Sequence, residues 1–114
     1  MLLPTDLLTG HALTAAQTHT FTLVPQGISL FTVTETVTHE VALFLITPGA
    51  NGVILGIGDT GSAFVVSAAP TAAQFGVSLV AATGVVTITT GSAATGTFKV
   101  DFISLDRMND KVAE

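Results

Sequence analysis

The chain has 114 residues, of which 48% are apolar and 10% are charged, so it provides material for one domain and excludes a multidomain enzyme. Eight acidic residues against three basic ones give a net charge of -5, which leaves no basic patch for nucleic acid. The absence of cysteine excludes disulfides, thiolate zinc sites and cysteine catalysis. Folding of so small a domain buries only about two-thirds of its unfolded surface, so we expect contacts between subunits to add stability.

The N-terminal span 1–16 mixes leucines with threonine and alanine, and we predict that it forms an arm. Its first residues carry no positive charge before Pro4 and do not resemble a secretory signal. No apolar run of the chain approaches the roughly 18 residues that span a bilayer, so no membrane partner is expected. Five leucines of the arm are predicted to contact a neighbouring subunit or the chain's own sheet. They are Leu2, Leu3, Leu7, Leu8 and Leu13.

Strand-forming residues dominate the rest of the chain, which contains nineteen threonines and eleven glycines with many valines and isoleucines. The clearest strand is predicted at 31–38, where Phe31, Val33 and Val37 share one face and threonines occupy the other. Other segments with this period of two are 19–23, 64–66, 75–79, 86–88 and 98–102.

Two further runs, 41–46 and 53–55, are apolar throughout and are predicted to be strands buried on both faces. Pro-Gly and Asn-Gly pairs between them indicate a turn. Together the segments predict an all-β fold of about eight strands, a two-sheet antiparallel β-sandwich with jelly-roll-like topology. We assign the sandwich to residues 17–105, between the arm 1–16 and a short polar tail at 106–114.

The segment 56–61 matches the pattern G-x-G-x-x-G of dinucleotide-binding proteins. That fingerprint requires a helix to begin at its last glycine and an acidic residue about twenty positions later. Here strand-like residues follow Gly61, and no Asp or Glu occurs between Asp59 and Asp101. We therefore predict a plain turn and no cofactor.

The triplet Asp59-Thr60-Gly61 resembles the signature of aspartic proteases, whose retroviral type is a homodimer with one such aspartate from each chain. That resemblance implies two Asp59 carboxyls sharing one proton. The family has two apolar residues before the aspartate, whereas this chain has Ile57 and Gly58. A turn between strands is the favoured interpretation.

Metal binding is not expected, because the three histidines lack the spacing of the jelly-roll metal proteins called cupins. His19 shares a face with Phe21 and is predicted to be partly buried and hydrogen-bonded, whereas His39 and Glu40 are predicted to be exposed at a strand junction. With no G-x-S-x-G motif and no lysine before Lys99, we do not expect an enzyme.

Two binding functions are also disfavoured by the sequence. Sugar-binding sandwiches usually rely on Trp and Tyr, and this chain has neither. The Thr-x-Thr runs resemble those of ice-binding β-solenoids, but no strict repeat is present, so threonine on the solvent face of ordinary strands is the preferred interpretation.

The chain is poor in charge and rich in Thr, Gly, Ala and Val. In this composition it resembles small virion proteins of tailed bacteriophages, as do its segments EVALFLI at 40–46 and GTFKVDFI at 96–103. The resemblance implies a capsid decoration (cement) protein, a homotrimer that binds the major capsid protein in virions assembled in the host cytoplasm. Alternatives are a tail or fibre-base protein, or a glycan-binding module that uses Asn51 or Asp59. A remoter one is the homodimeric protease based on Asp59.

Overall fold

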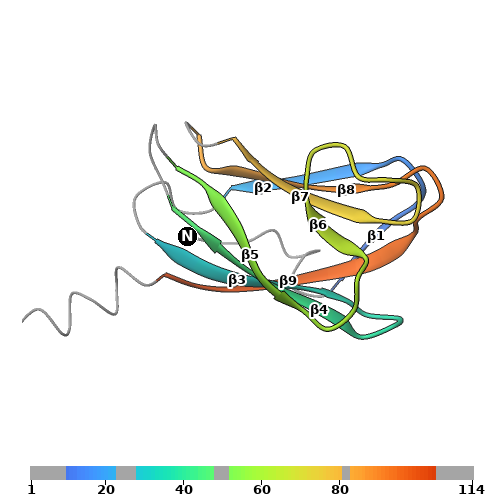
Figure 1. Cartoon of the computed structure of the whole chain (residues 1–114), viewed down its shortest axis with the longest axis horizontal. Helices are drawn as coiled ribbons and strands as arrows, with labels where there is room; N and C mark the ends of the chain where they lie inside the picture. The colour runs from blue at the N-terminus through green and yellow to red at the C-terminus, as the bar shows by residue number, and fades with distance from the viewer. Residues whose placement is uncertain (1–9, 23–27, 48–51, 81–82, 105–114) are drawn as a thin grey trace, which may run out of the picture.

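The computed structural model describes residues 10–22, 28–47, 52–80 and 83–104, which form nine strands in two facing sheets (Figure 1). The strands are β1 (His11–Leu13), β2 (Thr18–Thr22), β3 (Ser29–Glu35), β4 (Glu40–Ile46), β5 (Ile54–Asp59), β6 (Phe64–Val66), β7 (Phe75–Val80), β8 (Val85–Thr90) and β9 (Gly96–Ser104). The predicted all-β sandwich is thus confirmed. No helix among the described residues is long and apolar enough to cross a membrane.

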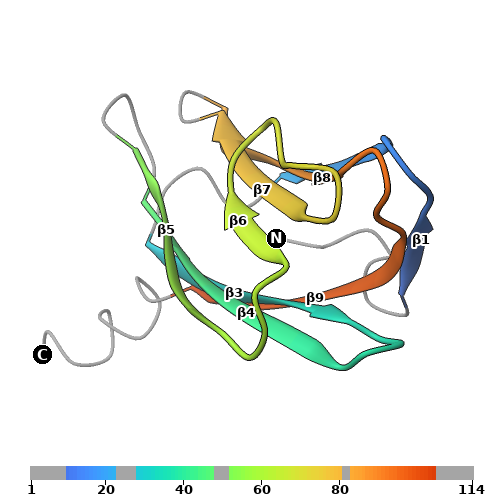
Figure 2. The same ribbon diagram turned by 45° about the vertical axis from the view of Figure 1, so that its right-hand side comes forward.

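Sheet A has the order β1-β9-β3-β4-β5, and sheet B has the order β2-β8-β7-β6 (Figure 2). The first and last strands pair with each other, and β2 pairs with β8 in the other sheet, as the outer strands of a jelly roll do. By contrast, β3, β4 and β5 form a simple meander. The sheets are antiparallel as predicted except at one pair, because β6 runs parallel to β7.

All eight predicted strands are present, and the ninth is β1, which lies within the span that we predicted to be an arm. Its three residues pair with residues 96–98 of β9, and the Leu13 side chain is buried in the core of its own chain. The sequence of β1, His-Ala-Leu, does not alternate between polar and apolar residues and so gives no strand signal. The other four leucines predicted at an interface, and the tail 106–114, lie outside the described residues.

Strand β3 is shorter than predicted, because its carboxyl end at Glu35 is followed by a turn instead of three more strand residues. His39 in this turn has a φ of 62°, a left-handed conformation that ends the extended chain. Val37, which we predicted on the buried face, is 76% exposed.

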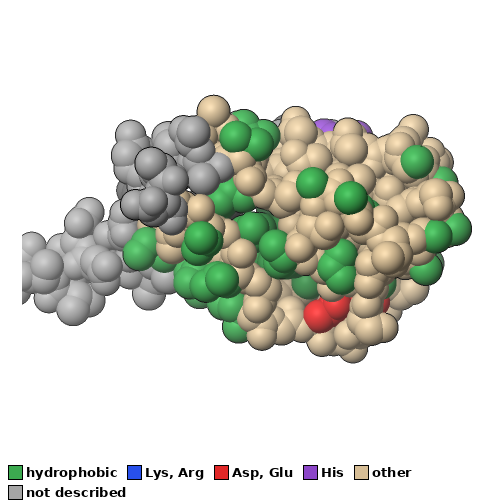
Figure 3. Space-filling view, turned by 45° about the horizontal axis from the view of Figure 1, so that its top comes forward, with side chains coloured by type: hydrophobic (Ala, Val, Ile, Leu, Met, Phe, Trp, Pro, Cys, Tyr) green, Lys and Arg blue, Asp and Glu red, His purple; other side chains and the backbone are tan. Residues whose placement is uncertain are grey.

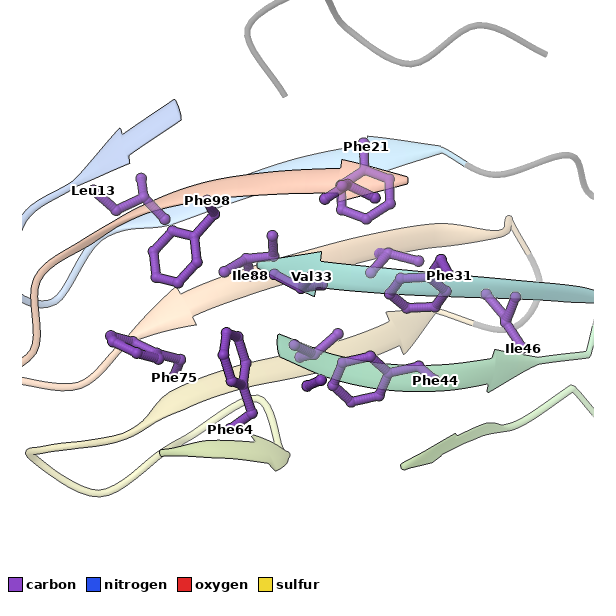
Figure 4. Close-up of a cluster of buried hydrophobic side chains, with 14 of the residues drawn as sticks. Leu13, Phe21, Phe31, Val33, Phe44, Ile46, Phe64, Phe75, Ile88 and Phe98 are labelled. Atoms are coloured by element: carbon purple, nitrogen blue, oxygen red, sulfur yellow. The ribbon is translucent and has the colours of Figure 1, made fainter. Parts of the chain in front are cut away.

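The core is built from two groups of phenylalanine rings contributed by both sheets (Figure 4). Phe31 lies between Phe21 and Phe44, at centroid distances of 6.2 and 5.1 Å. The second group is Phe64, Phe75 and Phe98, with centroids 4.9 to 6.1 Å apart. Truncating one such ring to alanine costs about 3 to 5 kcal/mol, so these six side chains dominate the stability of the fold.

The prediction of burial on both faces is wrong for the two apolar runs. In β4 only Ala42, Phe44 and Ile46 point into the core, and the alternate residues are half-buried on the outer face. β5 is an edge strand, where Leu55 is 50% exposed. In these two strands, the continuous apolar run reflects apolar residues on the outer face of sheet A as well as on the core face.

The two long sides of the sandwich differ. Between β1 and β2, the buried hydroxyl of Thr90 donates a hydrogen bond to the carbonyl of Thr14 at 2.6 Å and accepts one from the amide of Gln17 at 2.9 Å. These bonds fasten the β1–β2 connection to the end of β8. The opposite side, between the edge strands β5 and β6, is hollowed.

Candidate functional site

The hollow between β5 and β6, which we call the β5–β6 groove, has a volume of about 230 Å³ and a largely apolar lining (Figure 3). Its lining consists of Ala42, Phe44, Gly56, Ile57, Gly58, Asp59, Phe64, Val65 and Val66. Two of these side chains are well exposed at the rim, Ile57 at 54% and Val66 at 45%. Apolar side chains exposed around a hollow are typical of a surface that packs against a partner.

A β-bulge in β5 gives the groove this rim. Phe44 pairs with Gly56 while its neighbour Leu43 pairs with Gly58, so Ile57 is an extra residue without a partner in β4. Gly56 and Gly58 on either side let the chain kink at Ile57, whose side chain therefore departs from the alternation of inward and outward side chains along β5. A bulge also interrupts the free hydrogen-bonding edge, which disfavours the addition of a further straight strand.

An acidic pair, Glu40 and Asp59, lies at one end of the groove, where β4 begins and β5 ends. Asp59 accepts hydrogen bonds from the amides of Gly61 at 3.0 Å and Phe64 at 3.2 Å. Glu40 accepts one from the amide of Ala63 at 2.9 Å. The two carboxyls therefore hold the turn that carries the chain from sheet A to sheet B.

Burial raises the pKa of Glu40 above its usual 4.5, and the hydrogen bond and like charge of Asp59 raise it further. Amide donors oppose this rise only in part. A neighbouring negative charge disfavours the ionised form of a carboxyl. A carboxyl whose pKa is raised can exchange a proton with a bound molecule, but the oxygens of Glu40 and Asp59 are already engaged in holding the turn.

The structure accounts for both motifs at this turn. The last glycine of G-x-G-x-x-G is followed by β6 and not by a helix, as predicted. Thr60 bridges back to β4, where its hydroxyl accepts a hydrogen bond from the amide of Val41 at 2.9 Å. Any side chain at Gly61 would overlap the carboxylate of Glu40. The sequence Asp-Thr-Gly thus fits the geometry of this turn residue by residue.

A third carboxylate, that of Glu35, is only 2% exposed. It lies at the end of β3 opposite to Ser29, the residue that pairs with Ser104. One oxygen accepts hydrogen bonds from the amides of Val37 and Thr38 and from the Thr38 hydroxyl, at 3.1, 2.8 and 3.0 Å. The other oxygen accepts one from the amide of Thr97 at 2.9 Å. Burial alone would raise the pKa of Glu35, but these donors outweigh it and lower the pKa below 4.5.

The histidines are placed apart from the groove. His11 of β1 and His19 of β2 bring their rings to a centroid distance of 4.0 Å on the β1–β2 side of the sandwich, and His19 is half-buried. His39 is exposed, as predicted, whereas Glu40 is half-buried by its contact with Asp59. Within the described segments, no three His, Asp or Glu side chains lie close enough to hold a metal ion.

Sequence reasoning singled out Asp59 but missed its partner Glu40 and the exposed Ile57. The glycines that flank Ile57 were a usable signal, because glycine inside a strand often marks a bulge. Asn51, the other residue considered for glycan binding, lies outside the described residues. No protein-family model, curated protein or solved structure matches this chain.

Proposed function

We propose that this protein is a structural subunit that acts by assembly and not by catalysis. The observation that carries the proposal is the apolar β5–β6 groove, whose rim residues Ile57 and Val66 are exposed on one edge of the sandwich. Covering this edge with a neighbouring subunit adds apolar burial that a domain of this size needs. The bulge favours side-chain packing in the groove over the pairing of edge strands.

A groove is not complementary to itself, so its partner must present a different, convex surface. Contacts of that kind between identical chains are head-to-tail, and they form a ring when the rotation between neighbours closes and an open filament when it does not. This supports a homotrimer or a larger ring over a two-fold dimer. Together with the resemblance of the sequence to phage virion proteins, a head-to-tail assembly favours a virion component. The function we propose is that of a capsid decoration protein, which reinforces the major capsid protein lattice of a bacteriophage head.

The first experiment measures absolute mass by light scattering, with refractive-index detection because the chain lacks Trp, Tyr and Cys. We expect a trimer or larger ring for the wild type and a monomer for Ile57→Asp. Thr20→Asp, on the exposed face of sheet B, is the matched control and should leave the assembly intact. A wild type that stays monomeric at high concentration contradicts self-assembly.

The virion assignment is tested by immunogold electron microscopy of particles from the cells that encode the chain. Labelled heads support a decoration protein, labelled tails support the fibre-base or receptor-binding alternative, and unlabelled particles overturn the assignment. Deleting residues 2–9, which leaves β1 intact, should remove the protein from the particles if the N-terminal leucines contact the lattice.

The protease alternative has its own test. It requires cleavage of denatured protein at some pH between roughly 3 and 7, the range in which carboxyl pairs share a proton. Cleavage that Asp59→Asn abolishes would overturn the structural assignment.

A further inference from the structure

The outer face of sheet A carries a second apolar surface, separate from the groove, which we call the outer apolar patch. It consists of Ile28, Leu30, Leu43, Leu45, Val53 and Leu55. Leu30, Leu45 and Leu55 are direct cross-strand neighbours and form a row across β3, β4 and β5. Ile28 and Val53, at the same end of the sheet, are 37% and 45% exposed.

The outer face of sheet B is built differently, which shows that the patch is not a general property of this chain. Thr18 pairs with Thr89 and Thr20 with Thr87, so hydroxyl groups cover much of that face, whereas Val85 and Val80, which is 54% exposed, lie at one end of it. Antiparallel sheets that face water normally alternate in this way, whereas an apolar outer face is typical of a covered sheet.

The occupant of the patch is indicated by where the chain leaves the sheet. β9 ends at Ser104, which pairs with Ser29 of β3, at the same end of sheet A as the patch. Ten residues follow, and their large apolar members Leu105, Met108 and Val112 have the spacing i, i+3, i+7 of an amphipathic helix. The other positions of this segment are mostly charged.

We propose that residues 105–114 form an amphipathic helix that packs on the outer apolar patch of its own chain. A helix of ten residues is about 15 Å long. The distance from β9 across β3 and β4 to β5 is three strand spacings, or about 14 Å, so the segment is long enough to cross the row of leucines. None of the six patch residues is charged, and the charged side chains of the helix would face water.

This proposal is independent of the assembly function, and the lack of cysteine makes it directly testable. The double variant Leu45→Cys with Met108→Cys places one thiol in the patch and one in the segment. The control, Thr20→Cys with Met108→Cys, places the first thiol on the hydroxyl face of sheet B. With oxidised glutathione, we expect an intramolecular disulfide at least roughly tenfold faster in the patch pair, because docking raises the effective thiol concentration.

Mass spectrometry and non-reducing gels separate the outcomes. Equal rates in both pairs, or no disulfide in the patch pair, overturn the proposal. Disulfide-linked dimers in the patch pair also overturn it, since they show that the segment of a second copy occupies the patch.

Single substitutions provide a second readout that does not depend on cysteine. Met108→Lys should expose the patch and increase the binding of a hydrophobic dye. Asp110→Asn makes the same change in net charge on the opposite face of the helix and should leave dye binding unchanged. Equal dye binding by the two variants contradicts the proposal.

Discussion

Replacing Glu35 with glutamine should lower the free energy of unfolding by about 3 kcal/mol at neutral pH. The carboxylate is buried, and its two oxygens accept four hydrogen bonds. Glutamine can keep the three bonds made by one oxygen, although without their charge. Its amide nitrogen, however, would face the amide of Thr97, placing two donors 2.9 Å apart. One charged bond is lost at about 1.5 to 3 kcal/mol, and a buried N–H is left unpaired.

The assay is urea unfolding followed by circular dichroism. Asp101→Asn is the control, because the Asp101 carboxyl is exposed on β9, the strand that pairs with β3. The control should stay within about 0.5 kcal/mol of the wild type. A difference below about 0.5 kcal/mol between Glu35→Gln and the wild type at pH 7 would refute the argument, because surface substitutions produce changes of that size.

The pH dependence of this difference provides a further check on the same variant. Glu35 has a folded pKa below the ordinary 4.5, so the unfolded chain takes up protons first as the pH falls. The stabilisation by Glu35 is therefore complete above pH 4.5 and is lost as the pH falls through the folded pKa. The gap between wild type and Glu35→Gln should close in acid, and a gap that stays constant would contradict the burial of an ionised carboxylate.

Two other substitutions test the turn at Glu40 and the loop contact at Gly91. Because the pKa of Glu40 is raised in the folded state, the wild type should lose stability as the pH rises from 4.5 through the folded pKa. Glu40→Gln can still donate a hydrogen bond to Asp59 and should abolish this loss. Urea midpoints measured at several pH values test the difference. Gly91→Ala should cost about 2 kcal/mol in urea unfolding, since a Cβ there would overlap the carbonyl oxygen of Thr71; a neutral effect would show that this loop yields.

The other eight strands could be predicted from the sequence because alternation is a local property. Phe31 and Val33 are buried between half-buried threonines, as their spacing predicts. β1 could not be predicted, because its three residues are held in place by β9, more than eighty positions later in the chain. The exposure of β5 depends on its position at the edge of sheet A, and strand order is not encoded in the period.

The candidate site was less predictable for a related reason. Glu40 and Asp59 are nineteen residues apart, and they meet only because Ala42 pairs with Asp59 across a bulged ladder. Glu35 reaches Thr97, sixty-two residues away, through the pairing of β3 with β9. In both cases the carboxyl satisfies backbone amides at a strand end, a role that the registers of distant strands determine.

Because these carboxylates bind backbone amides within the chain, few free charges remain on the described surface to form ion pairs with a neighbouring subunit. Of the four acidic residues in the described ranges, Glu35, Glu40 and Asp59 accept backbone hydrogen bonds within the chain, and only Asp101 is exposed, with Lys99 as its basic neighbour on β9. Association through the apolar groove should therefore be insensitive to ionic strength. Light scattering at low salt and in about 1 M NaCl, where the screening length falls to about 3 Å, should give the same mass. Dissociation in high salt would place the interface at charged residues outside the described ranges instead of at the groove.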